Sequence, residues 1–328
     1  MTATAPLTDC AAVVIGRNEG ERLIACLDSL RAQFSHIVYV DSGSTDGSRA
    51  AAAIRGADVI VLDTRASFTA ARARNAGFFH LLDYGHALSF VQFLDGDCVL
   101  QPNWAQKARS FLLGAPQVAA VCGRRRELYP ERSVYNRLID AEWDTPVGQT
   151  KACGGDVMIR VTALQAMGGF NPDLIAGEEP ELCVRLRATG WIIWRLDAEM
   201  TLHDAALTRF SQWWQRARRA GFAYAEGVAM HGKAPERHNL RRLQRALVWG
   251  GLLPVMIPLA SVFLTPWALL GIGLWFLQVL RLSIKGMETL QAMFLTLAKF
   301  PEAQGAVTYL WRRWRGTNPQ LIEYKKPE

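Results

Sequence analysis

Short apolar runs alternate with longer amphipathic stretches over the first hundred residues of the chain. Each run holds five to seven mostly aliphatic residues, which is typical of a buried strand, whereas the intervening stretches have helical spacing. This alternation predicts an α/β fold with a mostly parallel sheet flanked by helices, whose ligands collect at the carboxyl ends of the strands. The predicted strands are 11–15, 36–40, 58–62 and 88–94. The first predicted helix begins at Asn18, which forms a capping box with Glu21, and the second follows Asp46, which caps it. The third begins at Phe68 and ends before Gly85.

An apolar stripe runs along residues 208–230 at alternating steps of four and three, which predicts one helix. Arginines occupy the rest of this helix. It therefore either lies in a membrane interface with its aromatic side chains down, or packs the stripe against a protein core. The stripe consists of Phe210, Trp214, Ala217, Gly221, Tyr224 and Val228.

The next segment, Ala246 to Leu280, runs for 35 residues without a charged side chain or histidine. One spanning helix needs about 20 apolar residues, so the segment is too long for one and short for two with a turn. Three prolines interrupt it, and arginines flank both ends, which favours a re-entrant or tight helical hairpin with both ends on the cytoplasmic side. The alternative is a buried helical pair in a soluble domain. After residue 287, Trp311-Arg-Arg-Trp-Arg315 is a basic aromatic cluster suited to a membrane interface.

Charge is distributed unevenly along the 328 residues. Up to Asp204 the chain has 20 basic and 24 acidic residues, and beyond it 17 basic and 6 acidic ones. A basic last third predicts an anionic partner, and the apolar run within it favours a membrane surface over nucleic acid. The six cysteines form no C-x-x-C pair, which favours reduced thiols in a cytosolic compartment, and no signal peptide is expected at the N-terminus.

Acidic residues follow two of the predicted strands. Asp95-Gly96-Asp97 offers two hard oxygen ligands for Mg²⁺ or Mn²⁺, although a solvated turn has the same pattern. Asp41, followed by Ser42 and Gly43, places a carboxylate, a hydroxyl and a flexible backbone at the end of another strand. There an ordinary capped turn is the alternative to a nucleotide contact.

Five motifs occur in the order found in family 2 glycosyltransferases, which the chain resembles over residues 11 to 205. The resemblance implies a GT-A fold, a nucleotide-diphosphate sugar donor, a divalent metal (Mg²⁺ or Mn²⁺) and inversion at the anomeric carbon. It implies that Asp41 reads the base, that Asp95 contacts the ribose or the metal, that Asp97 binds the metal directly, and that Arg74 lies near the donor phosphates. The first motif also adds Arg17, Asn18 and Glu19 to the implied donor site. The five motifs are Val13-Val-Ile-Gly-Arg-Asn-Glu19, Asp41-Ser-Gly-Ser-Thr-Asp-Gly47, Ala73-Arg-Asn-Ala-Gly77, Phe93-Leu-Asp-Gly-Asp97 and Gly177-Glu-Glu-Pro-Glu-Leu-Cys-Val-Arg185.

The last motif holds the candidate general base, since inversion needs a carboxylate that accepts the proton of the acceptor hydroxyl. The family usually shows Glu-Asp here, and Glu179 occupies the Asp position, so Glu179 is the predicted base and Glu178 the second candidate. A helix N-terminus enriched in acidic residues is the structural alternative. The resemblance also adds Gly155 and Asp156 to the donor site, where a turn competes, and His203 as a third metal ligand. Trp143 and Asp144 either face the acceptor or pack internally.

These observations predict a metal-dependent enzyme that moves one sugar to a lipid-linked or otherwise membrane-held acceptor in polysaccharide or glycoconjugate biosynthesis. Polymerases of the broader family carry Gln-x-x-Arg-Trp where this chain has Gln212-Trp-Trp-Gln-Arg216, which favours single transfers. The alternatives are a polyprenyl-phosphate sugar transferase and a non-catalytic nucleotide-sugar-binding membrane protein. The expected location is the bacterial inner membrane, with the catalytic domain in the cytoplasm. The predicted domains are 1–205 (catalytic), 206–245 (basic helical linker), 246–285 (membrane hairpin or re-entrant segment) and 286–328 (basic tail).

Overall fold

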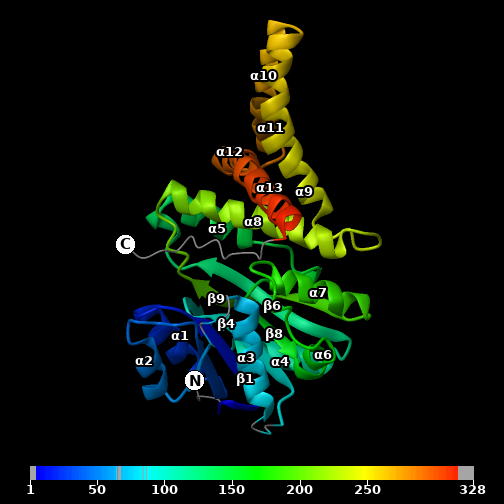
Figure 1. Cartoon of the computed structure of the whole chain (residues 1–328). Helices are drawn as coiled ribbons and strands as arrows, with labels where there is room; N and C mark the ends of the chain where they lie inside the picture. The colour runs from blue at the N-terminus through cyan, green and yellow to red at the C-terminus, as the bar shows by residue number, and fades with distance from the viewer. Residues whose placement is uncertain (1–4, 64, 66–67, 84, 86, 317–328) are drawn as a thin grey trace. The chain divides into compact units, whose positions relative to one another are not determined.

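The computed structural model of the chain describes residues 5–63, 65, 68–83, 85 and 87–316 (Figure 1). The chain divides into two compact units, Met1–Thr208 and Arg209–Glu328. The first unit is α/β and the second is helical. The predicted basic tail 286–328 is therefore described only as far as residue 316.

A nine-stranded sheet forms the centre of the first unit. Its first half is parallel in the order β3-β2-β1-β4, which confirms the predicted strand–helix alternation. Strand β8 continues the sheet antiparallel to β4, and β6, β9 and β5 follow, with β7 paired to β9. The strands are β1 (Leu7–Gly16), β2 (Phe34–Asp41), β3 (Asp58–Val61), β4 (Phe90–Asp95), β5 (Cys98–Leu100), β6 (Val118–Glu127), β7 (Gly148–Thr150), β8 (Val157–Arg160) and β9 (Ile192–His203).

Helices cover both faces of this sheet (Figure 1). Alternate residues of β1 belong to two hydrophobic cores, as a strand buried on both faces requires. One core includes residues of α1, α2 and α4, and the other includes residues of α3, α6 and α7. The helices are α1 (Glu21–Arg31), α2 (Ser48–Ile54), α3 (Ala70–Asp83), α4 (Trp104–Gly114), α5 (Val134–Trp143), α6 (Val161–Ala166) and α7 (Glu178–Ala188), with a short 3₁₀ turn η1 (Pro130–Arg132).

The predicted helix caps are only partly found. Asn18 has a φ of 56° and its side-chain oxygen accepts the backbone N–H of Thr45 at 2.7 Å, so the predicted capping box with Glu21 is wrong. The Asn18 side chain instead joins two loops at the strand ends. Asp46 does accept the first N–H of α2, that of Ser48, at 3.0 Å, although Gly47 holds the N-cap position.

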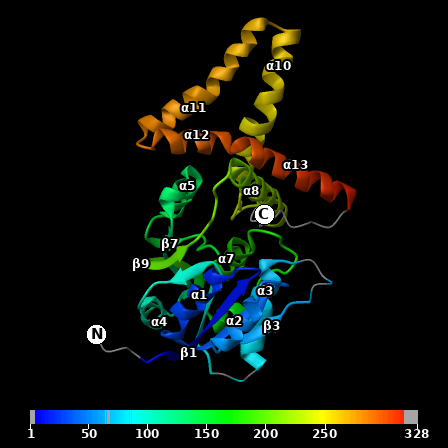
Figure 2. The same ribbon diagram turned by 90° about the vertical axis from the view of Figure 1, so that its left-hand side faces the viewer.

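The second unit consists of helices. Its long helix α8 packs along α13, and glycines allow the backbones to approach closely. A Cβ on Gly221 would lie 1.9 Å from the carbonyl oxygen of Glu302, and one on Gly305 would lie 1.9 Å from that of Arg218. Figure 2 shows α12 and α13 following one another. The elements are α8 (Phe210–His231), α9 (Leu240–Leu247), a π-helical turn η2 (Val248–Leu252), α10 (Leu253–Phe263), a 3₁₀ segment η3 (Pro266–Ile272), α11 (Gly273–Ile284), α12 (Thr289–Leu297) and α13 (Lys299–Arg315).

The buried face of α8 agrees only in part with the predicted stripe. Trp213, Phe222 and Ala225 are buried, whereas Phe210 is 45% exposed. Within the stripe, Gly221 is buried against α13, and Tyr224 and Val228 are half-buried and pack against a small core of Ala225, Leu243 and Ala306. The second half of the stripe therefore faces a protein core, whereas its first residue is exposed.

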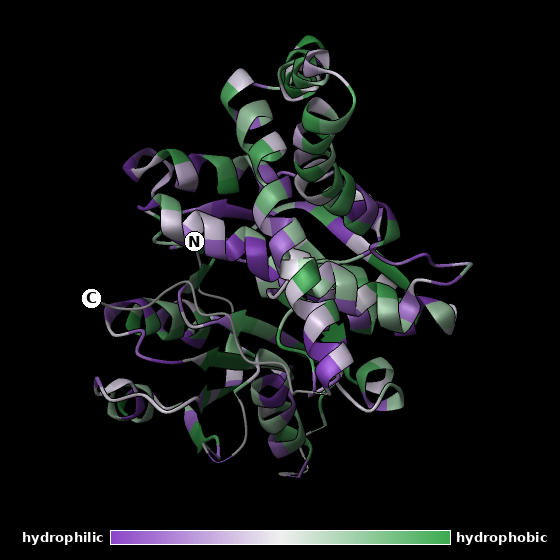
Figure 3. Ribbon diagram, turned by 45° about the horizontal axis from the view of Figure 1, so that its top comes forward, coloured by the Kyte–Doolittle hydropathy of each residue, from purple (hydrophilic) through white to green (hydrophobic). Residues whose placement is uncertain are grey.

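The uncharged run forms a helical hairpin. Two continuous helices, Leu240–Phe263 and Pro266–Ile284, are each long and apolar enough to cross a membrane. They meet near the turn, where Gly271 packs against Ile257. Their side chains are largely uncovered: 11% of the most apolar window is buried in the first helix and none in the second. The alternative of a helical pair buried in a soluble core is therefore not what the structure shows, and Figure 3 displays the hydropathy of these helices.

Candidate active site

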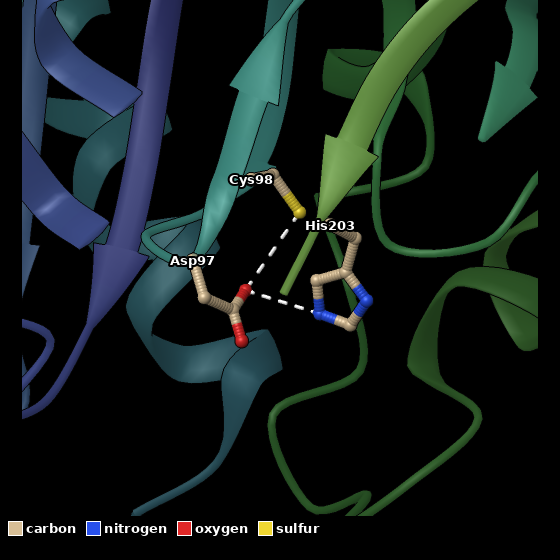
Figure 4. A group of neighbouring side chains, drawn as sticks. All are labelled: Asp97, Cys98 and His203. Atoms are coloured by element: carbon tan, nitrogen blue, oxygen red, sulfur yellow. Dashed lines mark hydrogen bonds and ion pairs between the residues drawn. The ribbon is translucent and has the colours of Figure 1, made fainter. Parts of the chain in front are cut away.

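The carboxyl ends of β2 and β4 and the end of β9 bring the predicted acidic residues and His203 into one region. Cys98 in β5 lies opposite His203 in the antiparallel pairing with β9, and the backbone N–H of Asp204 donates to the carbonyl of Asp97 at 3.1 Å. This register places Asp97 Oδ1 3.2 Å from Nε2 of His203 (Figure 4). Two residues about a hundred positions apart are thus adjacent because a short strand follows the Asp-Gly-Asp turn.

The donor atoms of Asp97, Cys98 and His203 all lie within 4.8 Å of one another. A carboxylate and an imidazole suit a divalent ion such as Mn²⁺. Burial raises the pKa of the Cys98 thiol well above its ordinary value, so Cys98 remains a protonated, weak ligand. Nδ1 of His203 is buried and has no hydrogen-bond partner within the described part of the chain. The residues present therefore fit a metal site centred on Asp97 and His203.

Asp95, the other carboxylate of the turn, is bound by Arg74. The guanidinium of Arg74 is 2% exposed, and its Nη2 lies 2.8 Å from Asp95 Oδ1 while its Nη1 donates to Glu178. Gly155 lies against this pair, since an added Cβ would be 2.8 Å from Nη2 of Arg74. The structure thus joins three predicted site residues through Arg74 and requires glycine beside them.

Glu179, the predicted base, is 2% exposed and accepts three hydrogen bonds. Its Oε1 accepts the N–H of Cys153 and the thiol of Cys183, both at 2.9 Å, and its Oε2 accepts the N–H of Gly154 at 2.9 Å. Burial raises the pKa of this carboxyl above its ordinary value. Glu179 therefore holds the loop that carries Gly155, while Glu178 faces Arg74. Neighbouring Glu181 forms a 2.9 Å ion pair with Arg185 within α7.

The remaining donor-site candidates lie where β1 separates β2 from β4. Asp41 is fully buried, and its Oδ2 accepts the N–H groups of Gly43 at 3.0 Å and Ser44 at 2.9 Å. The hydroxyl of Ser44 in turn accepts the N–H of Asn18 at 2.9 Å. The other candidates at this edge are Arg17, Glu19, Ser42 and Gly96. Arg17 lies over the Phe68 ring at 5.5 Å, and Glu19 forms a 2.7 Å ion pair with Arg22. The N–H of Gly96 donates to the carbonyl oxygen of Ile15 at 2.8 Å.

Asp156 lies behind this edge instead of facing it. It is fully buried, and it accepts the hydroxyl of Thr201 at 2.9 Å and the N–H of Asp95 at 3.4 Å. It also forms an ion pair with Arg125 Nε at 3.0 Å. Asp156 therefore supports the Asp-Gly-Asp turn from within the protein.

Arg125 is a site residue that the sequence reasoning missed. Its guanidinium carbon lies 5.1 Å from the centroid of the Trp143 ring, and that ring packs against His203 at 4.9 Å. The neighbouring Asp144 pairs with Arg124 and Arg195. A signal was available, because three consecutive arginines closely follow the apolar residues 118–122 within the predicted catalytic domain, and charged residues next to a core are usually paired.

Two family models match the chain: "Glycosyl transferase family 2" over residues 12–162 and "Glycosyl transferase family group 2" over residues 90–284. The second match continues through the helical hairpin. A curated relative, the succinoglycan biosynthesis protein ExoA of Rhizobium meliloti (strain 1021), is 23% identical over 304 residues, covering 86% of this chain and 89% of the relative.

Solved structures share the fold at low sequence identity. The mannosyltransferase PcManGT from Pyrobaculum calidifontis, in complex with GDP-Man and Mn²⁺, aligns with a TM-score of 0.62 and 18% identity, covering 94% of this chain and 88% of that one. Glucosyl-3-phosphoglycerate synthase from Mycobacterium tuberculosis, in complex with Mn²⁺ and UDP-glucose, aligns with a TM-score of 0.51 and 15% identity, covering 70% and 80%. Both likenesses support the same sheet and flanking helices.

Proposed function

Because the chain belongs to the family 2 glycosyltransferases, we propose that it moves one sugar, with inversion, from a nucleotide-diphosphate sugar to a membrane-held, lipid-linked acceptor. The observation that carries the proposal is the pairing of Asp97 with His203 at the strand ends, beside the Arg74 network and the acidic start of α7. Such a set provides a site for the leaving diphosphate next to carboxylates that accept a proton.

Asp97 and His203 are the proposed ligands of a divalent ion, Mn²⁺ or Mg²⁺. When bound, that ion supplies positive charge to the diphosphate leaving group. The solved complexes of PcManGT and glucosyl-3-phosphoglycerate synthase both contain Mn²⁺ with a nucleotide sugar, which supports this assignment. Asp95 belongs to the proposed donor site, where Arg74 fixes the orientation of its carboxylate.

Glu179 is the proposed general base, with Glu178 as the second candidate. Each carboxylate oxygen has two lone pairs, so Oε2 of Glu179, which holds one backbone N–H, retains a position for the proton of the acceptor hydroxyl. Its raised pKa makes it a stronger proton acceptor than an exposed carboxylate. The contacts to Cys153 and Gly154 keep the group in one orientation.

The hairpin supports the membrane-held acceptor. Its first arm has 18 uncharged residues from Ala246 to Phe263, which rise roughly 27 Å, close to the ~30 Å hydrocarbon core. The turn is apolar and exposed, since Phe263 and Leu264 are 77% and 82% exposed. Arginines stand at the outer ends of both arms, which favours the cytoplasmic side for the catalytic unit. The ExoA relative acts in the synthesis of a polysaccharide, which supports a polysaccharide or glycoconjugate product.

The decisive experiment supplies the purified full-length protein in nanodiscs with UDP-, GDP- and TDP-sugars, Mn²⁺ and a bacterial lipid extract. Nucleotide release and radioactive sugar in the lipid phase measure transfer. We expect one nucleotide class to support both signals, and a chelator to abolish them. Binding of a nucleotide sugar without either signal over the whole panel contradicts an enzymatic role.

A further inference from the structure

Only one of the two ring nitrogens of His203 has a polar contact among the residues described. Its Nε2 lies 3.2 Å from Asp97, whereas Nδ1 is buried without a hydrogen-bond partner among the residues described. Metal-binding histidines almost always donate their second ring N–H to a carboxylate or carbonyl group, and this bond fixes the rotation of the ring. Packing against a neighbouring side chain is the other way in which the orientation of this ring can be fixed.

Trp143 provides that contact. It is the last residue of α5, and its ring centroid lies 4.9 Å from that of His203 with an interplanar angle of 55°. The guanidinium of Arg125 lies over the indole at 5.1 Å, which is within the range of a cation–π contact. The indole is thus in contact with a fixed cation as well as with the imidazole.

Arg125 is itself anchored behind the Asp-Gly-Asp turn. Its Nε lies 3.0 Å from Oδ2 of Asp156, and the other oxygen of Asp156 accepts the backbone N–H of Asp95 at 3.4 Å. The contacts therefore form a closed path that begins at the backbone of Asp95, passes through Asp156, Arg125 and the indole, and returns through the imidazole to the side chain of Asp97. A path of this kind fixes the histidine relative to the carboxylate with which it would share an ion.

We infer that Trp143, held by Arg125, is a positioning residue that orients the His203 imidazole for a divalent cation, in place of the missing second hydrogen bond. The inference rests on the proposed function, since it takes Asp97 and His203 as the cation ligands. Loss of a hydrogen-bonded outer partner typically costs about 10- to 100-fold in metal affinity, and we expect loss of the indole contact to fall at the lower end of this range. Trp143→Leu removes the aromatic face, and Trp143→Phe retains one.

The test is a titration of the purified full-length protein with Mn²⁺ alone, read by the electron paramagnetic resonance signal of the free ion. We expect Trp143→Leu to weaken Mn²⁺ binding about tenfold and Trp143→Phe to stay within about threefold of the native protein. Electron spin-echo modulation from an imidazole nitrogen on the bound Mn²⁺ should be present in the native protein and in Trp143→Phe, and reduced in Trp143→Leu. Trp267→Leu, in the exposed hairpin, is the matched control and should change neither signal.

The outcomes separate the inference from the proposed function. Native Mn²⁺ affinity together with full nitrogen modulation in Trp143→Leu would overturn the inference. Weak binding in Asp97→Ala but native binding in His203→Ala also overturns it, and leaves a metal site at Asp97 without His203 as a ligand. Native binding in Asp97→Ala removes the proposed metal site itself. Should Trp143→Leu fail to fold, Trp143→Gln gives the same readouts, because this half-exposed position accommodates a polar side chain.

Discussion

The two units of the chain differ in which side chains are buried and which are exposed. In the first unit, charged side chains are buried and paired, as Arg74 is with Asp95 and Glu178. In the second unit, large apolar side chains are left uncovered, as Leu264 and Trp267 are at 82% and 76% exposure. Buried charges require partners in water-free surroundings, and a large exposed apolar surface marks contact with another apolar phase. The buried charges of the first unit suit chemistry within a protein interior, and the uncovered hairpin of the second supports the proposed contact with a membrane.

The largest expected effect tests the chemical side of this comparison. Asp97→Ala removes the carboxylate that faces His203, and we expect kcat/KM for sugar transfer to fall by roughly a thousandfold, the scale of losing a key electrostatic group at a transition state. Nucleotide release with the accepted donor measures the change. The circular dichroism of the variant should match that of the native protein, and a variant that retains a tenth of the native rate would contradict the assignment.

Glu179→Gln is expected to lower kcat by about a hundredfold or more, the usual contribution of a positioned base. The amide also places an N–H₂ group among the backbone donors of Cys153 and Gly154, so Glu179→Asp, the residue usual in the family, is the control that keeps a carboxylate. A pH–rate profile separates a base from a merely structural acid.

The direction of the expected pH dependence follows from the burial of Glu179. Its pKa is raised, so the native enzyme should lose activity as pH falls through a value above that of an ordinary glutamate, because the base becomes protonated. Glu179→Gln should lack this acid limb in its residual activity. An unchanged acid limb in Glu179→Gln would transfer the role to Glu178.

The third expected effect concerns the exposed apolar surface. Phe276→Arg places a charge near the middle of the second arm, where Phe276 is 73% exposed, and a charge at the centre of a spanning helix costs roughly 2–3 kcal/mol, or at least about thirtyfold in the ratio of bound to free protein. Ile54→Arg is the matched control, since Ile54 is 83% exposed on α2 of the first unit. Membrane pelleting after alkaline extraction measures both. Equal retention of the two variants would show that this arm of the hairpin does not lie in lipid.

The sequence predicted the parts of this protein that depend on local pattern. The four strands, the helices between them and the paired apolar helices all follow from periodicity, and the ordered motifs of the family predicted that Asp95, Asp97 and Glu179 lie at strand and helix ends. Local pattern could not predict features that depend on long-range register. The closeness of His203 and Asp97 was expected from the family resemblance alone, because it is created by the β5–β9 pairing, and the burial of Asp156 behind Asp95 requires the antiparallel β8. The α8 stripe was right only in part: Gly221, Tyr224 and Val228 do pack within the second unit, whereas Phe210 is exposed, and the pattern could not show that Gly221 marks a backbone contact with α13.

That contact gives the smallest of the expected effects and the one most specific to the second unit. An alanine at Gly305 would bring its Cβ to 1.9 Å from the carbonyl oxygen of Arg218, so α13 must move away from α8. Overpacking of this kind costs about 1–3 kcal/mol, and thermal denaturation in detergent should show a lowered melting temperature for the second unit. Gly273→Ala is the control within the same unit, because nothing lies within 4 Å of its added Cβ, and alanine is the better helix former. A Gly305→Ala protein as stable as Gly273→Ala would mean that the helices do not depend on this close approach. Unchanged Mn²⁺ binding in both variants would show that the packing of the second unit and the chemistry of the first can be altered separately.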